Sequence, residues 1–174
     1  MMTTGWLDAM SRPFGIEVGV VPTEDAKVVE THQLMARLHN NVCCLVDGDY
    51  DGQLYAATLA ANQPPPAAII RWSDGEMIED AVGWILAADA ANVIAKLVEI
   101  AETPLNSVAV VVEYLKAKKM DIIVYESIAE AIATTPECRA RAADLLAGLA
   151  CACAGSTATL RFTRGADGVW VFQP

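Results

Sequence analysis

Short runs of β-branched, uncharged residues separate longer stretches in which apolar residues recur every three or four positions. The short runs are typical of buried strands, because a strand in a parallel sheet is covered on both faces. The longer stretches are typical of helices with one apolar side. Strands are expected at residues 16–21, 42–46 and 67–72, and in a terminal hairpin with arms at 157–163 and 169–172.

The predicted helices follow from this apolar spacing and from the residues that interrupt it, proline above all. They cover residues 3–11, 22–39, 53–61, 79–87, 90–102, 107–119, 122–134 and 137–154. In the helix over 22–39 the buried side is expected to hold Val28, Met35 and Leu38, and in the helix over 53–61 it is expected to hold Leu54, Ala57 and Leu59.

The order of these elements predicts the fold class. Strand, helix and strand over residues 42–72 imply a right-handed parallel crossover. The expected class is α/β, with a small parallel sheet of Rossmann-like type flanked by helices, a helical C-terminal part and a terminal β-hairpin. A single domain over residues 1–174 is expected, with its α/β core at 14–85, its helical part at 86–155 and its hairpin at 156–174.

An acidic turn follows the strand at 42–46 and contains Asp47, Asp49 and Asp51. In an open α/β sheet, ligands bind at the carboxyl ends of the strands. Three carboxylates within five residues repel one another unless a cation or hydrogen-bond donors neutralise them, and oxygen ligands suit Mg²⁺ or Mn²⁺. The alternative is an ordinary strand-to-helix turn, in which an aspartate caps the next helix.

The motif Asp47-Gly48-Asp49-Tyr50-Asp51-Gly52 resembles the aspartate motif of TOPRIM domains, the metal-binding module of topoisomerases, bacterial primases and several nucleases. Its surroundings are most similar to the overcoming-lysogenisation-defect (OLD-like) nucleases. In those nucleases a further strand and an acidic turn follow, and residues 67–72 with the turn at 73–80 resemble that segment.

The resemblance implies which residues act. It implies that Asp47, Asp49 and Asp51 bind Mg²⁺ or Mn²⁺, with Glu79 as a further ligand, although Glu79 also suits the first turn of a helix. It implies that Asp47, Asp49 and Glu79 take part in catalysis together with Lys119, which resembles a lysine that begins a late helix and assists cleavage. Lys119 also suits a solvated helix end.

One feature departs from the family pattern. TOPRIM domains carry a glutamate, usually followed by glycine, at the end of an earlier strand, where it acts as acid or base. Here Glu17 lies inside the predicted strand at 16–21 and is followed by Val18. A residue in the middle of a strand points to one face of the sheet and not to its carboxyl end. Either the chain lacks this glutamate, or another segment or subunit supplies it.

Three functions remain open at this point. The first is Mg²⁺-dependent hydrolysis of phosphodiester bonds in nucleic acid, with DNA favoured over RNA. The second is a catalytically incomplete TOPRIM-like binding module that acts with a separate ATPase subunit. The third uses Asp47 as a phosphoryl acceptor, as in receiver or hydrolase proteins, but the chain shows no matching lysine and threonine strands. An apolar face around Leu145 and Leu149 packs either on the sheet or on a second copy, as in a homodimer.

Composition narrows these choices. The formal net charge of −10 opposes binding to nucleic acid unless cations, a basic partner or clustered basic residues offset it. Arg161 and Arg164 of the hairpin are candidates for phosphate contacts. The five cysteines lie in apolar segments without metal-ligand spacing, which predicts buried reduced thiols and not a zinc site. No long apolar run predicts a membrane span and no signal peptide is visible, so a cytoplasmic protein is expected.

Overall fold

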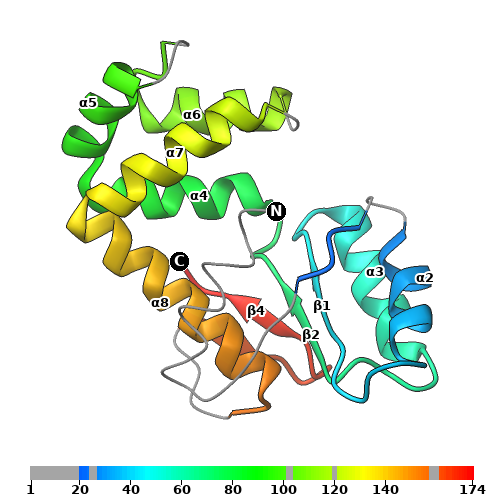
Figure 1. Cartoon of the computed structure of the whole chain (residues 1–174). Helices are drawn as coiled ribbons and strands as arrows, with labels where there is room; N and C mark the ends of the chain where they lie inside the picture. The colour runs from blue at the N-terminus through cyan, green and yellow to red at the C-terminus, as the bar shows by residue number, and fades with distance from the viewer. Residues whose placement is uncertain (1–19, 24–26, 101–103, 119–120, 157–160) are drawn as a thin grey trace. The chain divides into compact units, whose positions relative to one another are not determined.

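The computed structural model describes residues 20–23, 27–100, 104–118, 121–156 and 161–174 (Figure 1). The strands within these residues are β1 (Cys43–Val46), β2 (Ala68–Arg71), β3 (Phe162–Arg164) and β4 (Trp170–Phe172). The helices are α2 (Val28–Met35), α3 (Tyr50–Ala61), α4 (Ile78–Leu86), the short 3-10 helix η3 (Ala87–Asp89), α5 (Ala90–Ile100), α6 (Val108–Ala117), α7 (Ile122–Thr134) and α8 (Pro136–Cys153).

The expected α/β class is confirmed, and the expected parallel sheet is in fact mixed. Its four strands lie in the order β1-β2-β4-β3. β1 pairs with β2 and β2 pairs with β4 in parallel, whereas β3 and β4 form the predicted antiparallel hairpin. The predicted helix over 3–11 and Glu17 lie outside the described residues. So does most of the predicted strand over 16–21, and its last two residues, Val20 and Val21, are not in a strand.

Contacts divide the chain into two compact units. The sheet unit comprises the described residues up to Met77 together with those from Asp144 onward, and the helical unit comprises those from Ile78 to Ala143. Helix α8 therefore contributes its first half to the helical unit and its second half to the sheet unit. The sheet unit is assembled from two segments that are far apart in the sequence.

Successive side chains along the strands point to opposite faces of the sheet, and both faces carry buried residues. On one face Cys44, Val46 and Ile69 pack with Val28 of α2 and Leu59 of α3. The other face carries Trp72, Phe162 and Phe172, whose rings meet with a Trp72–Phe172 centroid distance of 5.4 Å in an edge-on arrangement. The Cys43 thiol faces the end of α8, where the Cys153 carbonyl oxygen lies 3.7 Å away. Leu145 of α8 is also buried.

Two details of the expected helix packing are wrong. Leu54 and Ala57 of α3 are exposed, because the buried row of this helix is Gly52, Ala56 and Leu59. The predicted helix over 22–39 is shorter, since α2 ends at Met35 and Leu38 is 72% exposed. The first difference arises because the apolar spacing of α3 fits more than one row, and the sheet decides which row is covered.

The helical unit is held by close backbone approach and by a few polar contacts. A Cβ atom on Gly83 of α4 would lie 2.6 Å from the side chain of Val112 on α6, so this glycine lets the two helices approach closely. Lys116 of α6 forms an ion pair of 2.8 Å with Asp80 of α4. Lys96 of α5 donates to the carbonyl oxygen of Thr134, at the end of α7.

One helical segment of the described residues, Ile78–Glu99, is long and apolar enough to cross a membrane by length and composition alone, with a mean hydropathy of 1.5. A third of the residues in its most apolar stretch are buried inside the protein. Core helices of water-soluble proteins meet the same criteria. Val93 and Leu97 of this segment are fully buried, as expected for core residues.

The described cysteines are free thiols, in agreement with the sequence analysis. Cys44 and Cys138 are buried and the other three are half-buried. Burial raises the pKa of the Cys44 thiol to about 12 because the charged thiolate is disfavoured away from water. Cys44 is therefore an apolar core residue in chemical terms.

His32 of α2 is the most deeply buried titratable side chain of the sheet unit's described residues, at 2% exposed. Its Nδ1 lies 3.3 Å from the side-chain amide nitrogen of Asn62, whereas its Nε2 has no hydrogen-bond partner among the described residues. Burial lowers the pKa of the imidazole below its ordinary value, because the protonated form is disfavoured away from water.

The free energy of unfolding should therefore fall as the pH drops below about 6.5, the ordinary pKa of histidine. In that range the unfolded chain binds a proton that the folded protein does not. The slope is at most about 1.4 kcal/mol per pH unit, and the loss ends below the lowered folded pKa. Urea unfolding at several pH values should show this dependence in the wild type and a flatter one in His32→Gln. His39→Gln is the matched control because His39 is exposed, and an equal flattening in both variants would contradict the prediction.

Candidate functional site

Two acidic turns meet at the carboxyl edge of the sheet. Val46 of β1 pairs in register with Arg71 of β2, so the turns that follow the two strands begin at the same level. The Gly48 amide donates to the Glu76 carbonyl oxygen at 2.7 Å, and the Gly75 amide donates to the Gly48 carbonyl oxygen at 2.8 Å. We name the pair of turns, residues 47–52 and 73–76, the acidic edge.

Glycine is required where the two turns touch. A Cβ atom on Gly48 would lie 1.7 Å from the Ser73 carbonyl oxygen and 2.7 Å from the Trp72 carbonyl oxygen. Both neighbours are backbone atoms, which cannot move aside as a flexible side chain can. Gly52 meets a similar limit, because its Cβ would lie 2.0 Å from the Asp47 carbonyl oxygen. The two glycines of the aspartate motif therefore serve the packing of the turn.

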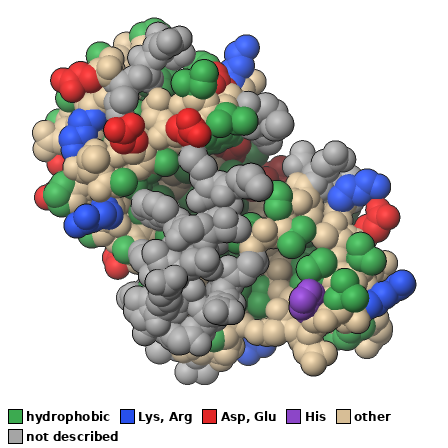
Figure 2. Space-filling model, in the orientation of Figure 1, with side chains coloured by type: hydrophobic (Ala, Val, Ile, Leu, Met, Phe, Trp, Pro, Cys, Tyr) green, Lys and Arg blue, Asp and Glu red, His purple; other side chains and the backbone are tan. Residues whose placement is uncertain are grey.

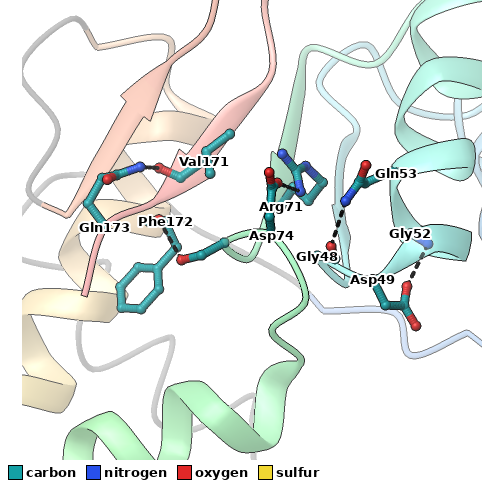
Figure 3. Close-up of polar contacts among 10 residues, drawn as sticks. Gly48, Asp49, Gly52, Gln53, Arg71, Asp74, Val171, Phe172 and Gln173 are labelled. Carbon is teal, nitrogen blue, oxygen red and sulfur yellow. Dashed lines mark hydrogen bonds and ion pairs between the residues drawn. The ribbon is translucent and has the colours of Figure 1, made fainter.

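Asp49 caps helix α3. Its backbone is extended, and its Oδ1 accepts a hydrogen bond of 2.8 Å from the Gly52 amide (Figure 3). The Gln53 side-chain amide donates to the Gly48 carbonyl oxygen at 3.0 Å, which fixes the same turn from the helix side. The capping interpretation of the acidic turn thus holds for Asp49. The cap uses one carboxylate oxygen, Oδ1.

The other two aspartates occupy different positions. Asp47 directly follows β1 and is half-buried. Asp51 lies in the first turn of α3 and is exposed, where the helix dipole favours a negative charge. All three predicted aspartates therefore lie within one turn, and the second turn adds Asp74 and Glu76 to the same edge.

Arg71, the last residue of β2, is a site residue that the sequence analysis did not single out. Its Nη1 lies 2.6 Å from Oδ1 of Asp74. The Arg71 side chain is 14% exposed, whereas that of Asp74 is 80% exposed. The sequence signal was available, since a cation ends a strand three residues before an aspartate of an acidic turn.

Glu79 and the lysines lie in a different setting. Glu79 belongs to α4 of the helical unit, is 4% exposed, and has a buried Oε2 without a hydrogen-bond partner among the described residues. The hydrogen bond to Asp80, with further contributions from Glu113 and Glu79, raises the pKa of Lys116. Lys119 lies outside the described residues. Lys116, three residues before Lys119, thus forms an ion pair within the helical unit.

The donor set decides how a metal ion would be held. Among the described residues, no group of three or more His, Cys, Asp or Glu side chains is close enough together to hold a metal ion. Mg²⁺ commonly keeps several waters and takes only one or two carboxylates plus phosphate oxygens of a substrate. Asp47 and the carboxylate of Asp49 fit a site of this kind and do not fit an all-protein cage.

Comparisons with protein-family models, with curated proteins and with solved structures find no match for this chain. The interpretation of the acidic edge therefore depends on its own geometry and on the motif of residues 47–52. The geometry supplies one fact for it: the two turns that carry these acidic residues are joined through backbone hydrogen bonds.

The contact between the turns predicts the effect of a single methyl group. Gly48→Ala should destabilise the protein by about 3 kcal/mol or more, because its Cβ would overlap backbone atoms. Gly75→Ala is the matched control: it lies in the same edge at a φ of +78° with open space around it, so only backbone strain of about 1 kcal/mol is expected. Chemical denaturation measures both, and a smaller loss for Gly48→Ala than for Gly75→Ala would contradict the arrangement.

Proposed function

We propose that this chain is a TOPRIM-like module that binds Mg²⁺ or Mn²⁺ at the acidic edge and hydrolyses phosphodiester bonds in nucleic acid, DNA rather than RNA. The observation that carries the proposal is the joining of two acidic turns at the carboxyl ends of the parallel strands β1 and β2. Ligands bind at this end of an open α/β sheet. We further propose that the protein is cytoplasmic.

Asp47 and Asp49 are the proposed metal ligands of the edge, with Asp51 as an additional ligand. A bound divalent ion orients the attacking water and offsets negative charge on the phosphate. Asp49 has its carboxylate held by the Gly52 amide, so its second oxygen has a fixed direction. An acid or base is also required. Lys119, which the resemblance implies, lies outside the described residues, and so does Glu17, which does not match the family's glutamate.

The negative net charge of the chain opposes the binding of nucleic acid that this function requires. The chain carries 12 Lys and Arg against 22 Asp and Glu. On the face drawn in Figure 2, the Lys and Arg side chains of the described residues are scattered and form no continuous basic patch. Nucleic acid would approach this face against a net repulsion. Divalent ions at the edge and a basic partner are the two ways to reduce it.

A second candidate function rests on one specific observation. Asp49 is already used as a helix cap, and no three-ligand group occurs among the described residues. These facts favour a non-catalytic TOPRIM-like module that acts with a separate ATPase subunit, as a monomer or a homodimer. In this candidate the acidic edge binds an ion or a partner without cleaving a phosphodiester.

Substitutions at Asp49 separate the capping role from metal binding. Asn caps a helix as well as Asp does, so Asp49→Asn should leave stability unchanged while it removes most of the heat of Mg²⁺ binding in calorimetry. Asp49→Ala should lose both the binding and about 1 kcal/mol of stability. Asp144→Asn, an exposed residue of α8, is the control that should change neither.

A plasmid-nicking assay in the same buffers decides between the two candidates. Mg²⁺-dependent nicking that is lost in Asp49→Asn and kept in Asp144→Asn supports the nuclease. Binding of Mg²⁺ without nicking supports the partner module. The absence of any Mg²⁺ binding by the wild-type protein would overturn the metal site in both.

A further inference from the structure

An open hollow of about 420 Å³ lies on the sheet unit next to the acidic edge. It begins where the helices stop covering one sheet face. Cys44, Val46 and Ile69 of that face are buried in the core cluster, whereas the next positions across the sheet, Arg71, Val171 and Thr163, open into the hollow. Its lining comprises Arg71, Ser73, Asp74, Thr163, Gly165, Val171 and Gln173, and we name it the arginine hollow.

Hydrogen bonds join some of the residues that line the arginine hollow. The Ser73 hydroxyl donates to the Phe172 carbonyl oxygen at 2.9 Å, which ties the turn after β2 to the end of β4. The Gln173 side-chain amide is held near the Val171 carbonyl oxygen. The volume falls in the range of small-ligand sites, which is roughly 300–1,000 Å³. The Ser73 hydroxyl thus joins two of the elements that line the hollow.

Arg71 is the only cationic side chain that lines the hollow among the described residues. A guanidinium has five N–H donors in a planar fork that matches phosphate oxygens. In Arg71, Nη1 forms an ion pair with the Asp74 carboxylate. The two partners differ in burial, because the Arg71 side chain is 14% exposed and the Asp74 side chain is 80% exposed. An exposed carboxylate of this kind gains little from its ion pair, about 0–1 kcal/mol.

We infer that the arginine hollow binds a backbone phosphate of nucleic acid, with Arg71 as its ligand and Asp74 as a carboxylate that the phosphate displaces. The inference rests on the proposed function and names its substrate contact. The turn that carries Ser73 and Asp74 is hydrogen-bonded to Gly48. A phosphate held by Arg71 therefore lies beside the acidic edge, and the strand continues toward Asp47 and Asp49.

Opposite effects at the two partners of one ion pair test this inference. Binding of a fluorescent single-stranded DNA oligonucleotide in Mg²⁺ buffer is measured by anisotropy at several salt concentrations. Arg71→Gln should weaken binding about tenfold and lower the salt dependence by about one phosphate contact. Asp74→Asn should strengthen binding by up to about fivefold, because it removes the competing charge.

Arg37→Gln, an exposed arginine after α2, is the matched control and should match the wild type apart from a general charge effect. Urea unfolding establishes that the variants are folded. If the ion pair is only structural, both Arg71→Gln and Asp74→Asn weaken binding in proportion to lost stability, and the inference is overturned. Unchanged binding in Arg71→Gln overturns it as well.

Two further measurements are needed. The first tests whether the bound phosphate belongs to nucleic acid, and the second tests whether the phosphate contact depends on the proposed hydrolysis. A dinucleotide should compete with the oligonucleotide well below the concentration at which inorganic phosphate competes, and equal competition would reduce the hollow to a general anion site and overturn the nucleic-acid assignment. Asp49→Asn should abolish nicking while it leaves the Arg71-dependent binding in place. If the wild type shows no nicking but the Arg71 and Asp74 effects persist, the proposed hydrolysis fails and the phosphate contact stands.

Discussion

The backbone contact between Gly48 and the turn after β2 is the constraint on which the acidic edge depends. Parallel pairing of β1 and β2 brings two chain reversals to one level, and both reversals are acidic. Side-chain carboxylates alone would push these turns apart. Reciprocal hydrogen bonds between Gly48, Gly75 and Glu76 hold them together, since backbone amides and carbonyls pair regardless of the local charge. Backbone hydrogen bonds thus hold two acidic turns together at this edge.

This arrangement gives two of the motif residues a structural role and a chemical role at once. Asp49 caps the N-terminus of α3 by accepting a hydrogen bond from the Gly52 amide. The same hydrogen bond orients the Asp49 carboxylate. Gly48 permits the close approach of the turns, and its carbonyl oxygen accepts from Gly75 and Gln53. A substitution that removes either residue changes the fold and the site together. Function is therefore best tested with replacements that keep the local geometry, such as Asp to Asn.

Most of the fold could be predicted from the sequence because its signals are local. The runs at 43–46 and 68–71 are short, uncharged and bounded by turns, and α7 begins and ends where Asp121 and Pro136 interrupt the apolar spacing. The packing of α3 could not be predicted, because Leu54 and Leu59 suit a buried row equally well until the sheet selects one of them. Pairing of β2 with β4 was also hidden, since no local pattern joins residues 70 and 170.

The site shows the same division between local and distant information. The aspartates, the capping role of one of them and the nearness of the second acidic turn follow from residues 42–80. The hollow around Arg71 also requires Val171, Thr163 and Gln173, which lie about a hundred residues later in the chain. A charged residue at the end of a strand has no evident role until the strand beside it is known.

The pairing of β2 with β4 has a consequence for the order in which the protein can be made. During synthesis, β1, α3 and β2 emerge long before β4, and the helical unit is completed in between. Until β4 arrives, the side of β2 that it covers has unpaired backbone groups, and Trp72 lacks its ring contact with Phe172. Such an open strand invites pairing with other chains. A nascent chain of this protein is therefore most vulnerable to aggregation, and most in need of a chaperone, in the interval between the translation of residue 71 and that of residue 172.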